Sequence, residues 1–315
     1  MIVTLAGGVG ASRLLRGLVR AVDPRSVVAV VNTGDDIELH GLHVSPDLDT
    51  VTYALAGVVH PEQGWGVADE SWTVMDSLDH FGRFAPESSA AGATWFRLGD
   101  RDLATHLYRT QRLRERAPLS QATAEITRSW ELGCRLIPMS DDRVETRVEV
   151  DDEGEIGFQE YFVRLRHSVI ARSVRFAGAA AASPAPGVLE SLEAADRVVI
   201  APSNPVVSIA PILAVPGIEE MVAARREDTV AVSPIIAGAA LKGPADRLMA
   251  ELGHEPSVVG VARMWAPVAA TLVVDEADAA LAPAVEEEGV RCVVAPTIMR
   301  GRAEAIALAQ VVLGA

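Results

Sequence analysis

The sequence has few of the residues that mark secreted proteins or proteins that bind polyanions. Only two of its 315 residues are cysteines, Cys134 and Cys292, and they lie far apart. Neither a disulfide framework nor a structural zinc site is therefore expected. The chain has a single lysine, Lys242, and a formal net charge of −15. Because a surface this acidic repels polyanions, we expect no binding of nucleic acid and no adhesion to anionic lipid.

Long uninterrupted apolar runs are missing as well. The longest apolar stretch spans about residues 198–218, and it contains four prolines and Asn204. A membrane-spanning helix would hardly tolerate these residues. The N-terminus also lacks the charged region of a secretory signal, because Met1–Leu5 runs directly into glycines. We therefore predict a soluble, cytoplasmic protein with no membrane partner.

The remaining composition is typical of a chain with a large buried core, with 49% hydrophobic and 23% charged residues. A short β-prone run at Ile2–Leu5 and a continuous apolar run at Val27–Val31 flank a segment whose apolar residues recur at helical spacing. Such runs are typical of parallel strands covered on both faces. Similar runs return at 197–201, 229–233, 271–274 and 291–295, again alternating with helical patterns. The pattern predicts an α/β fold, a doubly wound, mostly parallel, Rossmann-like sheet with a large mixed insertion.

The middle of the chain follows a different pattern. Residues from about 69 to 133 have the spacing of helices with polar faces, and residues 143–166 alternate like an antiparallel hairpin. We therefore expect two parts. Residues 1–68 and 187–315 form a nucleotide-binding α/β domain, and residues 69–186 form a helical and β-hairpin insertion that covers the acceptor site.

A glycine-rich loop follows the first predicted strand and precedes a predicted helix. Its backbone N–H groups and the positive end of the helix suit a phosphate, so we assign nucleotide binding to Gly7, Gly8, Gly10 and Ser12. The loop lacks the Gly-Lys-Ser/Thr of a Walker loop. It also has Arg13 where a dinucleotide fingerprint requires its third glycine, which argues against NAD. A tight turn that only packs helix against strand is the alternative.

Four aspartates follow the second predicted strand within fifteen residues: Asp35, Asp36, Asp47 and Asp49. A Ser-Pro pair just before Asp47 predicts a helix start, with the serine as its cap, so Asp47 and Asp49 occupy the first turn. Clustered carboxylates repel one another unless a cation joins them, and hard oxygen ligands suit Mg²⁺. We predict a Mg²⁺ site with Asp47 and Asp49 as ligands. The alternative is that these aspartates only complement the helix dipole.

Three further segments carry polar residues suited to a ligand. Asp100 is expected to cap a helix whose first turn carries Arg101, a position that the dipole disfavours for a cation. Arg101 therefore faces either an anionic or hydroxylated ligand or a neighbouring carboxylate. Ser203 and Asn204 end a later strand and offer a hydroxyl and an amide to a nucleotide, although turn formation also explains them. Lys242 is either a phosphate partner or an ordinary surface lysine.

Seven segments together resemble the 2-phospho-L-lactate transferases (CofD/FbiA type). They are spread over nearly the whole chain, at Asn32–Asp36, Gly41–Val51, Leu98–His106, Gln159–Val163, Ala201–Pro205, Val232–Ile235 and Lys242–Pro244. The Pro-Asp-Leu-Asp-Thr segment and the Leu-Gly-Asp-Arg-Asp segment are specific to this family, whereas the glycine loop is not.

The resemblance implies a Mg²⁺-assisted transferase of coenzyme F-420 biosynthesis. Such an enzyme moves a phospholactyl or phosphoenolpyruvyl group from a guanosine-diphosphate-linked donor to the deazaflavin alcohol Fo and releases GMP. The resemblance also implies that Asp49 and Arg101 bind Fo, and it suggests a homodimer. Asp49 or Asp36 is then the carboxylate that orients the Fo hydroxyl or accepts its proton. Nothing local distinguishes a lactyl from an enolpyruvyl donor.

A second class of protein in the same superfamily is the alternative. These are regulatory proteins that bind a nucleotide-sugar and have no obvious catalysis. They share the glycine loop, so that loop does not discriminate between the two classes. The segments Ser45–Thr50 and Leu98–His106 favour the transferase.

Overall fold

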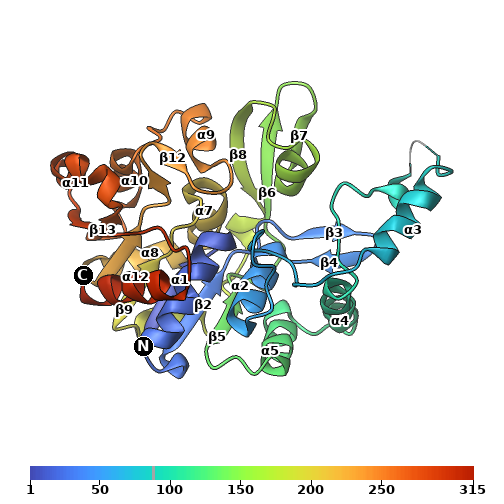
Figure 1. Cartoon of the computed structure of the whole chain (residues 1–315), viewed down its shortest axis with the longest axis horizontal. Coiled ribbons are helices and arrows are strands. Elements are labelled where there is room, and N and C mark those ends of the chain that lie inside the picture. Colours follow the sequence, from blue (N-terminus) through green and yellow to red (C-terminus); the bar gives the residue numbers. More distant parts are fainter. Residues whose placement is uncertain (87–88) are drawn as a thin grey trace.

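A computed structural model describes residues 1–86 and 89–315 of the chain. At its centre is a seven-stranded sheet in the order β14-β13-β10-β9-β1-β2-β5, in which every neighbouring pair is parallel (Figure 1). The strands are β1 (Ile2–Ala6), β2 (Val27–Val31), β5 (Arg135–Pro138), β9 (Arg197–Ile200), β10 (Thr229–Val232), β13 (Thr271–Val274) and β14 (Arg291–Val294). This sheet confirms the predicted α/β class.

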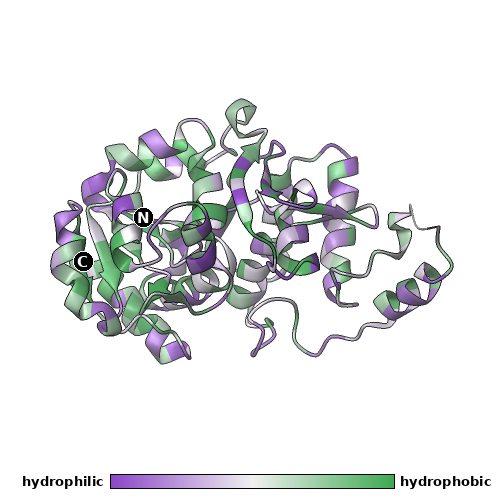
Figure 2. Cartoon of the chain, turned by 90° about the horizontal axis from the view of Figure 1, so that it is seen from above, coloured by the Kyte–Doolittle hydropathy of each residue, from purple (hydrophilic) through white to green (hydrophobic). Residues whose placement is uncertain are grey.

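Helices cover both faces of the sheet, because the buried strands are apolar on both sides. In β1, Val3 and Leu5 join one core, while Ile2 and Ala6 join the other. The second core is closed by α1 (Gly8–Ala21), α2 (Pro46–Ala56), α5 (Leu119–Ser129) and α12 (Arg302–Gly314). The first core is closed by α6 (Val188–Glu193), α8 (Ile218–Ala224), α10 (Val258–Trp265) and α11 (Ala282–Glu287). Figure 2 shows hydrophobic strands inside the body and hydrophilic stretches on the outer helices.

Smaller elements surround the carboxyl edge of the sheet. The hairpin β3 (Ile37–Leu39) and β4 (Leu42–Val44) runs toward an arm that carries α3 (Thr73–Gly82) and extends away from the body (Figure 1). Near the base of this arm lies α4 (Asp102–Arg114). A three-stranded antiparallel sheet comprises β6 (Glu145–Val150), β7 (Gly154–Gly157) and β8 (Ala171–Ala177). The remaining short elements include α7 (Ala210–Leu213), β11 (Ile235–Ile236), β12 (Ala239–Ala240) and α9 (Ala245–Glu251).

The middle of the chain differs from the expectation at two points. The segment 69–186, expected as an insertion, contributes β5 to the central sheet, where it forms the edge beside β2. This strand is short, begins with an exposed arginine and ends in proline, so its apolar signal is weak. The expected second hairpin strand stops at Gly157, and Glu160–Arg164 form a π-helix. The reason is that Phe158, Tyr161 and Phe162 recur at helical spacing.

The strand order creates a crevice at the carboxyl ends of β1 and β9. From β1 the chain proceeds through β2 to β5 on one side, and from β9 it proceeds through β10, β13 and β14 on the other. Such a reversal parts the connecting loops and is where doubly wound sheets place their ligands. The loops that meet here begin at Gly7 and at Ala201.

No single helix in the described part of the chain has both the length and the apolar composition needed to cross a bilayer. One pair of consecutive helical segments, Pro205–Leu213 and Ile218–Ala224, is long and apolar enough when the two are taken together, but the pair is bent by 93°.

Close packing of α1 against α12 generates a stability prediction. A Cβ built on Gly17 would lie 2.0 Å from the carbonyl oxygen of Ala305. Gly17→Ala should therefore push the helices apart and lower the free energy of unfolding by about 1–3 kcal/mol, despite the better helix propensity of alanine. Gly314→Ala is the matched control, since nothing lies within 4 Å of its Cβ position. Urea denaturation measures both, and a Gly17→Ala protein as stable as the wild type would contradict this packing.

Candidate active site

A cavity of about 780 Å³ opens at the crevice between β1 and β9. The glycine loop, the first turn of α2, the first turns of α4 and the loop after β9 all contribute lining residues. Aromatic side chains from the arm and from the π-helix segment form another part of the wall: Trp65, Trp72, Trp95, Phe96, Phe158 and Phe162. The cavity therefore has three kinds of lining: the backbone of the glycine loop at one end, the aspartates as an acidic wall, and the aromatic side chains as an aromatic wall.

The glycine loop is shorter than predicted, because α1 already begins at Gly8. Gly7 remains in extended conformation, and its carbonyl accepts a hydrogen bond of 2.8 Å from the Ser203 hydroxyl. Gly10 lies inside the helix, where a Cβ would meet the carbonyl oxygen of Pro202 at 2.0 Å. Gly7, Gly8 and Gly10 line the cavity, whereas Ser12 does not. The Ser12 hydroxyl instead donates to a carbonyl of its own helix.

The residues after β9 tie the two sides of the crevice together. Ser203 bonds to Gly7 as described, and Asn204 accepts hydrogen bonds from Val206 and Val207 at the start of the following helical turn. Both Ser203 and Asn204 line the cavity. The structure thus brings these two predicted nucleotide-binding residues beside the glycine loop, although they also have the turn-forming role that the sequence left open.

Asp47 lies in the first turn of α2, directly beneath the glycine loop. Its Oδ2 accepts a hydrogen bond of 2.9 Å from Asn32, and a Cβ on Gly7 would lie 2.7 Å from the same oxygen. Asp35 is also buried, and its Oδ1 has no hydrogen-bond partner among the described residues. Burial raises the pKa of Asp47 to about 7, and burial together with the charge of Asp47 raises the pKa of Asp35 well above its usual range. These two carboxylates therefore lack a compensating positive charge.

Asp36, predicted as a candidate catalytic carboxylate, does not line the cavity. Its Oδ2 accepts a hydrogen bond of 2.7 Å from Ser45 and lies 2.9 Å from His43 Nε2. Burial raises the pKa of Asp36, and these two contacts oppose the rise. The Ser45 hydroxyl consequently does not cap α2, contrary to the expectation from the Ser-Pro pair. Asp36 instead links β4 to the loop after β2.

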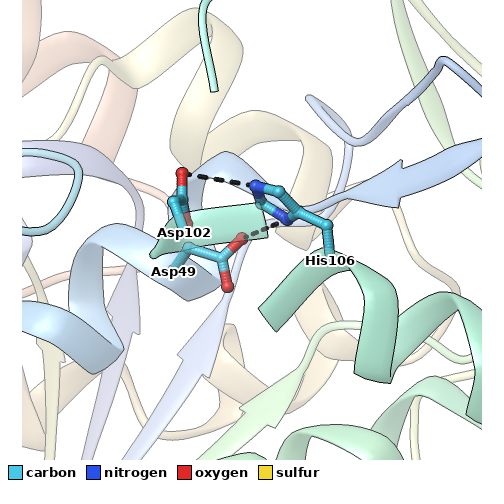
Figure 3. A group of neighbouring side chains, drawn as sticks. All are labelled: Asp49, Asp102 and His106. Carbon is cyan, nitrogen blue, oxygen red and sulfur yellow. Dashed lines mark ion pairs between the residues drawn. The ribbon is translucent and has the colours of Figure 1, made fainter. Parts of the chain in front are cut away.

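Asp49 lines the cavity and is paired with a fully buried arginine. Arg109 of α4 donates to both carboxylate oxygens of Asp49, with Nη1 at 3.1 Å from Oδ2. His106 stands between Asp49 and Asp102, with Nδ1 at 3.6 Å from Asp49 and Nε2 at 3.3 Å from Asp102 (Figure 3). Both His106 and Arg109 are only 1% exposed. The hydroxyl of Tyr53 completes the group by donating to Asp102 at 2.5 Å.

These side chains are close enough to form a second candidate metal site. Asp49, Asp102 and His106 offer ligand atoms that all lie within 4.8 Å of one another. The guanidinium of Arg109 already compensates Asp49, and burial of Asp102 is offset by His106, which lowers the Asp102 pKa. A metal ion there would have to face the buried Arg109 charge. The group is therefore better suited to holding carboxylates in place than to binding a cation.

Arg101 and Asp100 lie differently from the expectation. α4 begins at Asp102, and the side chain of Glu70 accepts hydrogen bonds from the main-chain N–H groups of Arg101 and Asp102. Asp100 instead accepts from the first turn of α3, and hydrogen bonds, first from Ser71, lower its pKa to about 2. The Arg101 side chain is exposed, donates to the carbonyl of residue 68 and does not line the cavity.

Arg109 was not identified as a site residue from the sequence, and no role in the site was assigned there to Asp102 or His106. Asp102, His106 and Arg109 are spaced i, i+4 and i+7, which places them on one face of α4. A helical face of polar residues gives no sign by itself of being buried. A signal was nevertheless present: Asp102 and His106 belong to the Leu98–His106 segment, and Arg109 follows on the same face of the helix three residues after His106.

Comparisons with known proteins find relatives over nearly the whole chain. A model of the family described as 2-phospho-L-lactate transferase CofD matches residues 2–305. A phosphoenolpyruvate transferase of Kitasatospora aureofaciens is 49% identical over 303 residues, which cover 95% of this chain and 92% of that protein. The protein of the same name from Thermobifida fusca is 48% identical over 290 residues (88% and 87%), and that of Mycolicibacterium smegmatis is 42% identical over 288 residues (87% and 86%).

A solved structure shares the fold. The crystal structure of a UPF0052 family protein from Bacillus halodurans superimposes with a TM-score of 0.62 at 18% identity, over 99% of this chain and 98% of that one. This likeness supports the fold class alone.

The sequence matches decide between the two predicted classes of function. The family match spans the aspartate cluster and the segment around Arg101, which are the parts that favoured the transferase over the regulator. The predicted transferase of coenzyme F-420 biosynthesis is therefore supported over the nucleotide-sugar regulator. The chain belongs to the 2-phospho-L-lactate transferase family.

Proposed function

We propose that this transferase moves a phosphoenolpyruvyl group from a guanosine-diphosphate-linked donor to the hydroxyl of Fo. The observation that carries the proposal is that one cavity joins a helix N-terminus, buried uncompensated carboxylates and an aromatic wall. The choice of the enolpyruvyl over the lactyl donor rests on the names of the relatives, which share 41–49% identity with this chain. Such a reaction is mainly a matter of positioning the phosphates and neutralising their charge.

The glycine loop is proposed to hold the diphosphate of the donor. Gly7 and Gly8 line the cavity at the N-terminus of the 14-residue helix α1, where the Gly7 N–H donates to Ser203 Oγ at 3.3 Å and the Gly8 N–H donates to the Asp47 carboxylate. These groups have no partners within the helix and carry its partial positive charge, which suits a phosphate. Ser203 and Asn204 on the opposite side of the crevice are proposed to contact the nucleotide.

The residues present fit a Mg²⁺ ion beneath this loop. Asp47 and Asp35 are buried carboxylates on the same cavity, they repel one another, and Asp35 Oδ1 lacks a partner. Of the two predicted ligands we retain Asp47, and we propose Asp35 in place of Asp49, because the guanidinium of Arg109 already compensates the charge of Asp49. A bound Mg²⁺ would neutralise charge on the phosphates and on the departing GMP.

Asp49 is proposed to orient the Fo hydroxyl and accept its proton. Arg109 fixes the direction of the Asp49 carboxylate on the cavity wall. The hydroxyl oxygen forms a bond to the terminal phosphorus of the donor, and the bond from that phosphorus to the bridging oxygen breaks. The bridging electron pair leaves with GMP, and the hydroxyl proton passes to Asp49.

The aromatic wall of the cavity suits the planar ring of the deazaflavin. Arg101 is proposed to contact Fo at the rim of the cavity after its side chain releases the carbonyl of residue 68.

The direct test is incubation of the protein with Fo, Mg²⁺ and each guanylylated donor in turn. Mass spectrometry should detect stoichiometric GMP and an Fo product carrying phosphoenolpyruvate. Faster turnover with the lactyl donor would overturn the choice of donor. Absence of GMP with either donor would overturn the proposed reaction.

The pair formed by Asp49 and Arg109 allows structural and chemical roles to be separated. Asp49→Asn or Arg109→Met leaves one buried charge without its partner and should lower the free energy of unfolding by about 3–5 kcal/mol. The double variant removes both charges and should recover most of that stability. Its transfer rate should nevertheless stay low, because the carboxylate is missing. Denaturation curves and GMP release measure the two effects.

A matched control lies on the same helix. Arg112 of α4 pairs with Glu125 near the surface, so Arg112→Met should cost less than about 1 kcal/mol and leave transfer unchanged. A double variant that transfers at the wild-type rate with saturating Fo and Mg²⁺ would show that Asp49 does not act on the Fo hydroxyl.

Mg²⁺ should stabilise the wild-type protein through Asp47. Because burial raises the pKa of Asp47 to about 7, the metal-free folded protein holds a proton more tightly than the unfolded chain, and its stability falls as the pH rises from about 4 to about 7. Metal binding displaces that proton, so the Mg²⁺-induced rise in melting temperature should be larger at pH 8 than at pH 6. Thermal unfolding with Mg²⁺ or EDTA measures this.

Asp47→Asn should abolish the Mg²⁺ effect without destabilising the metal-free protein, because it removes a buried charge. Asp152→Asn, in an exposed turn, should respond to Mg²⁺ as the wild type does. An Asp47→Asn protein with an unchanged response to Mg²⁺ would exclude Asp47 as a ligand.

A further inference from the structure

Two cations on the cavity wall face no carboxylate. Arg13 of α1 and Lys242 both line the cavity. Within the described part of the chain, their side chains donate only to main-chain carbonyls: Arg13 to Met299, and Lys242 to Glu62 and Gln63. By contrast, Arg97, which also lines the cavity, pairs with Asp76. Unpaired cations on a cavity wall suit an anion supplied by the ligand.

The two cations are also close enough to influence one another. Partial burial, followed by the charge of Arg13, lowers the pKa of Lys242. Arg13 belongs to the same helix whose N-terminus carries Gly8 and Gly10. Both cations thus line the same cavity as that N-terminus, and an anion bound in the cavity would reduce the repulsion between them.

Lys242 also connects two segments of the cavity rim. The strap, residues 59–67, is closed at its base by the bridge between Val59 and Val67. Near its tip the ammonium of Lys242 donates to the carbonyls of residues 62 and 63 at 3.0 and 2.7 Å, and it lies 5.5 Å from the centre of the Trp65 ring. The tip also touches the glycine loop, because a Cβ on Gly64 would lie 2.8 Å from Val9 Cγ1.

We propose that Arg13 and Lys242 form a clamp for the diphosphate of the nucleotide donor, and that Lys242 exchanges its strap carbonyls for phosphate oxygens when the donor binds. The inference rests on the proposed nucleotide donor and adds the residues that recognise its charge. Carbonyl acceptors are neutral, so a phosphate is the stronger partner for the ammonium. The exchange moves Lys242 away from the Trp65 ring and couples occupancy of the cavity to the position of the strap.

Binding of GDP with Mg²⁺, measured by calorimetry and compared with binding of guanosine, tests the clamp. Lys242→Met should weaken GDP binding about tenfold or more and leave guanosine binding unchanged, because only GDP carries the phosphates. Lys242→Arg should bind GDP within about threefold of the wild type. Arg128→Met, an exposed residue of α5, makes the same change in net charge and should have no effect.

A fluorescence measurement tests the exchange itself. GDP with Mg²⁺ should change the tryptophan emission of the wild type, and this change should be lost in Trp65→Phe and in Lys242→Met. In turnover assays Lys242→Met should raise the KM for the donor and leave kcat and the KM for Fo nearly unchanged.

The outcomes separate this inference from the proposed function. Equal GDP affinity in Lys242→Met and the wild type would overturn the clamp, and so would an equal loss of GDP and guanosine binding, which indicates a damaged rim. Failure of the wild type to bind GDP with Mg²⁺ would overturn the nucleotide assignment as a whole.

Discussion

Compensation of buried negative charge is the constraint on which the site depends. The carboxyl edge of the sheet gathers aspartates from the loop after β2 and from the first turns of α2 and α4. Each ionised carboxylate there loses hydration and must find a positive or hydrogen-bonding partner. Asp36 has His43 and Ser45, and Asp49 has Arg109. Among the described residues, Asp35 and Asp47 are the pair left without a cation, and they line the cavity together with the glycine loop that we propose for the phosphates.

The cavity is consequently divided by charge. Asp47 and Asp35 line it beside the N-terminus of α1, whereas Arg13 and Lys242 line it without a carboxylate partner among the described residues. A diphosphate bound with a divalent cation supplies both missing charges at once. Under the proposed function, this arrangement would let a protein with a net charge of −15 accept a diphosphate, since local groups override the global field at short range.

The sheet was predictable because its signal is local. Five continuous apolar residues in β2, and a run in β1 interrupted only by Thr4, demand cover on both faces, whatever the rest of the chain does. β5 was not predictable in this way, since an edge strand that begins with Arg135 and ends with Pro138 needs few apolar residues. The π-helix at Glu160–Arg164 was missed because helical and alternating patterns overlap in short aromatic segments.

The partners of the site residues depend on contacts that no local pattern specifies. The spacing of Asp47 and Asp49 indicates one helical turn, but it does not tell which of them turns toward a metal. That difference arises because α4, more than fifty residues later, delivers Arg109 to Asp49 and nothing to Asp47. The proposed separate roles of these two aspartates follow from this difference, since the guanidinium of Arg109 compensates the charge of Asp49 and fixes the direction of its carboxylate, whereas it makes no contact with Asp47.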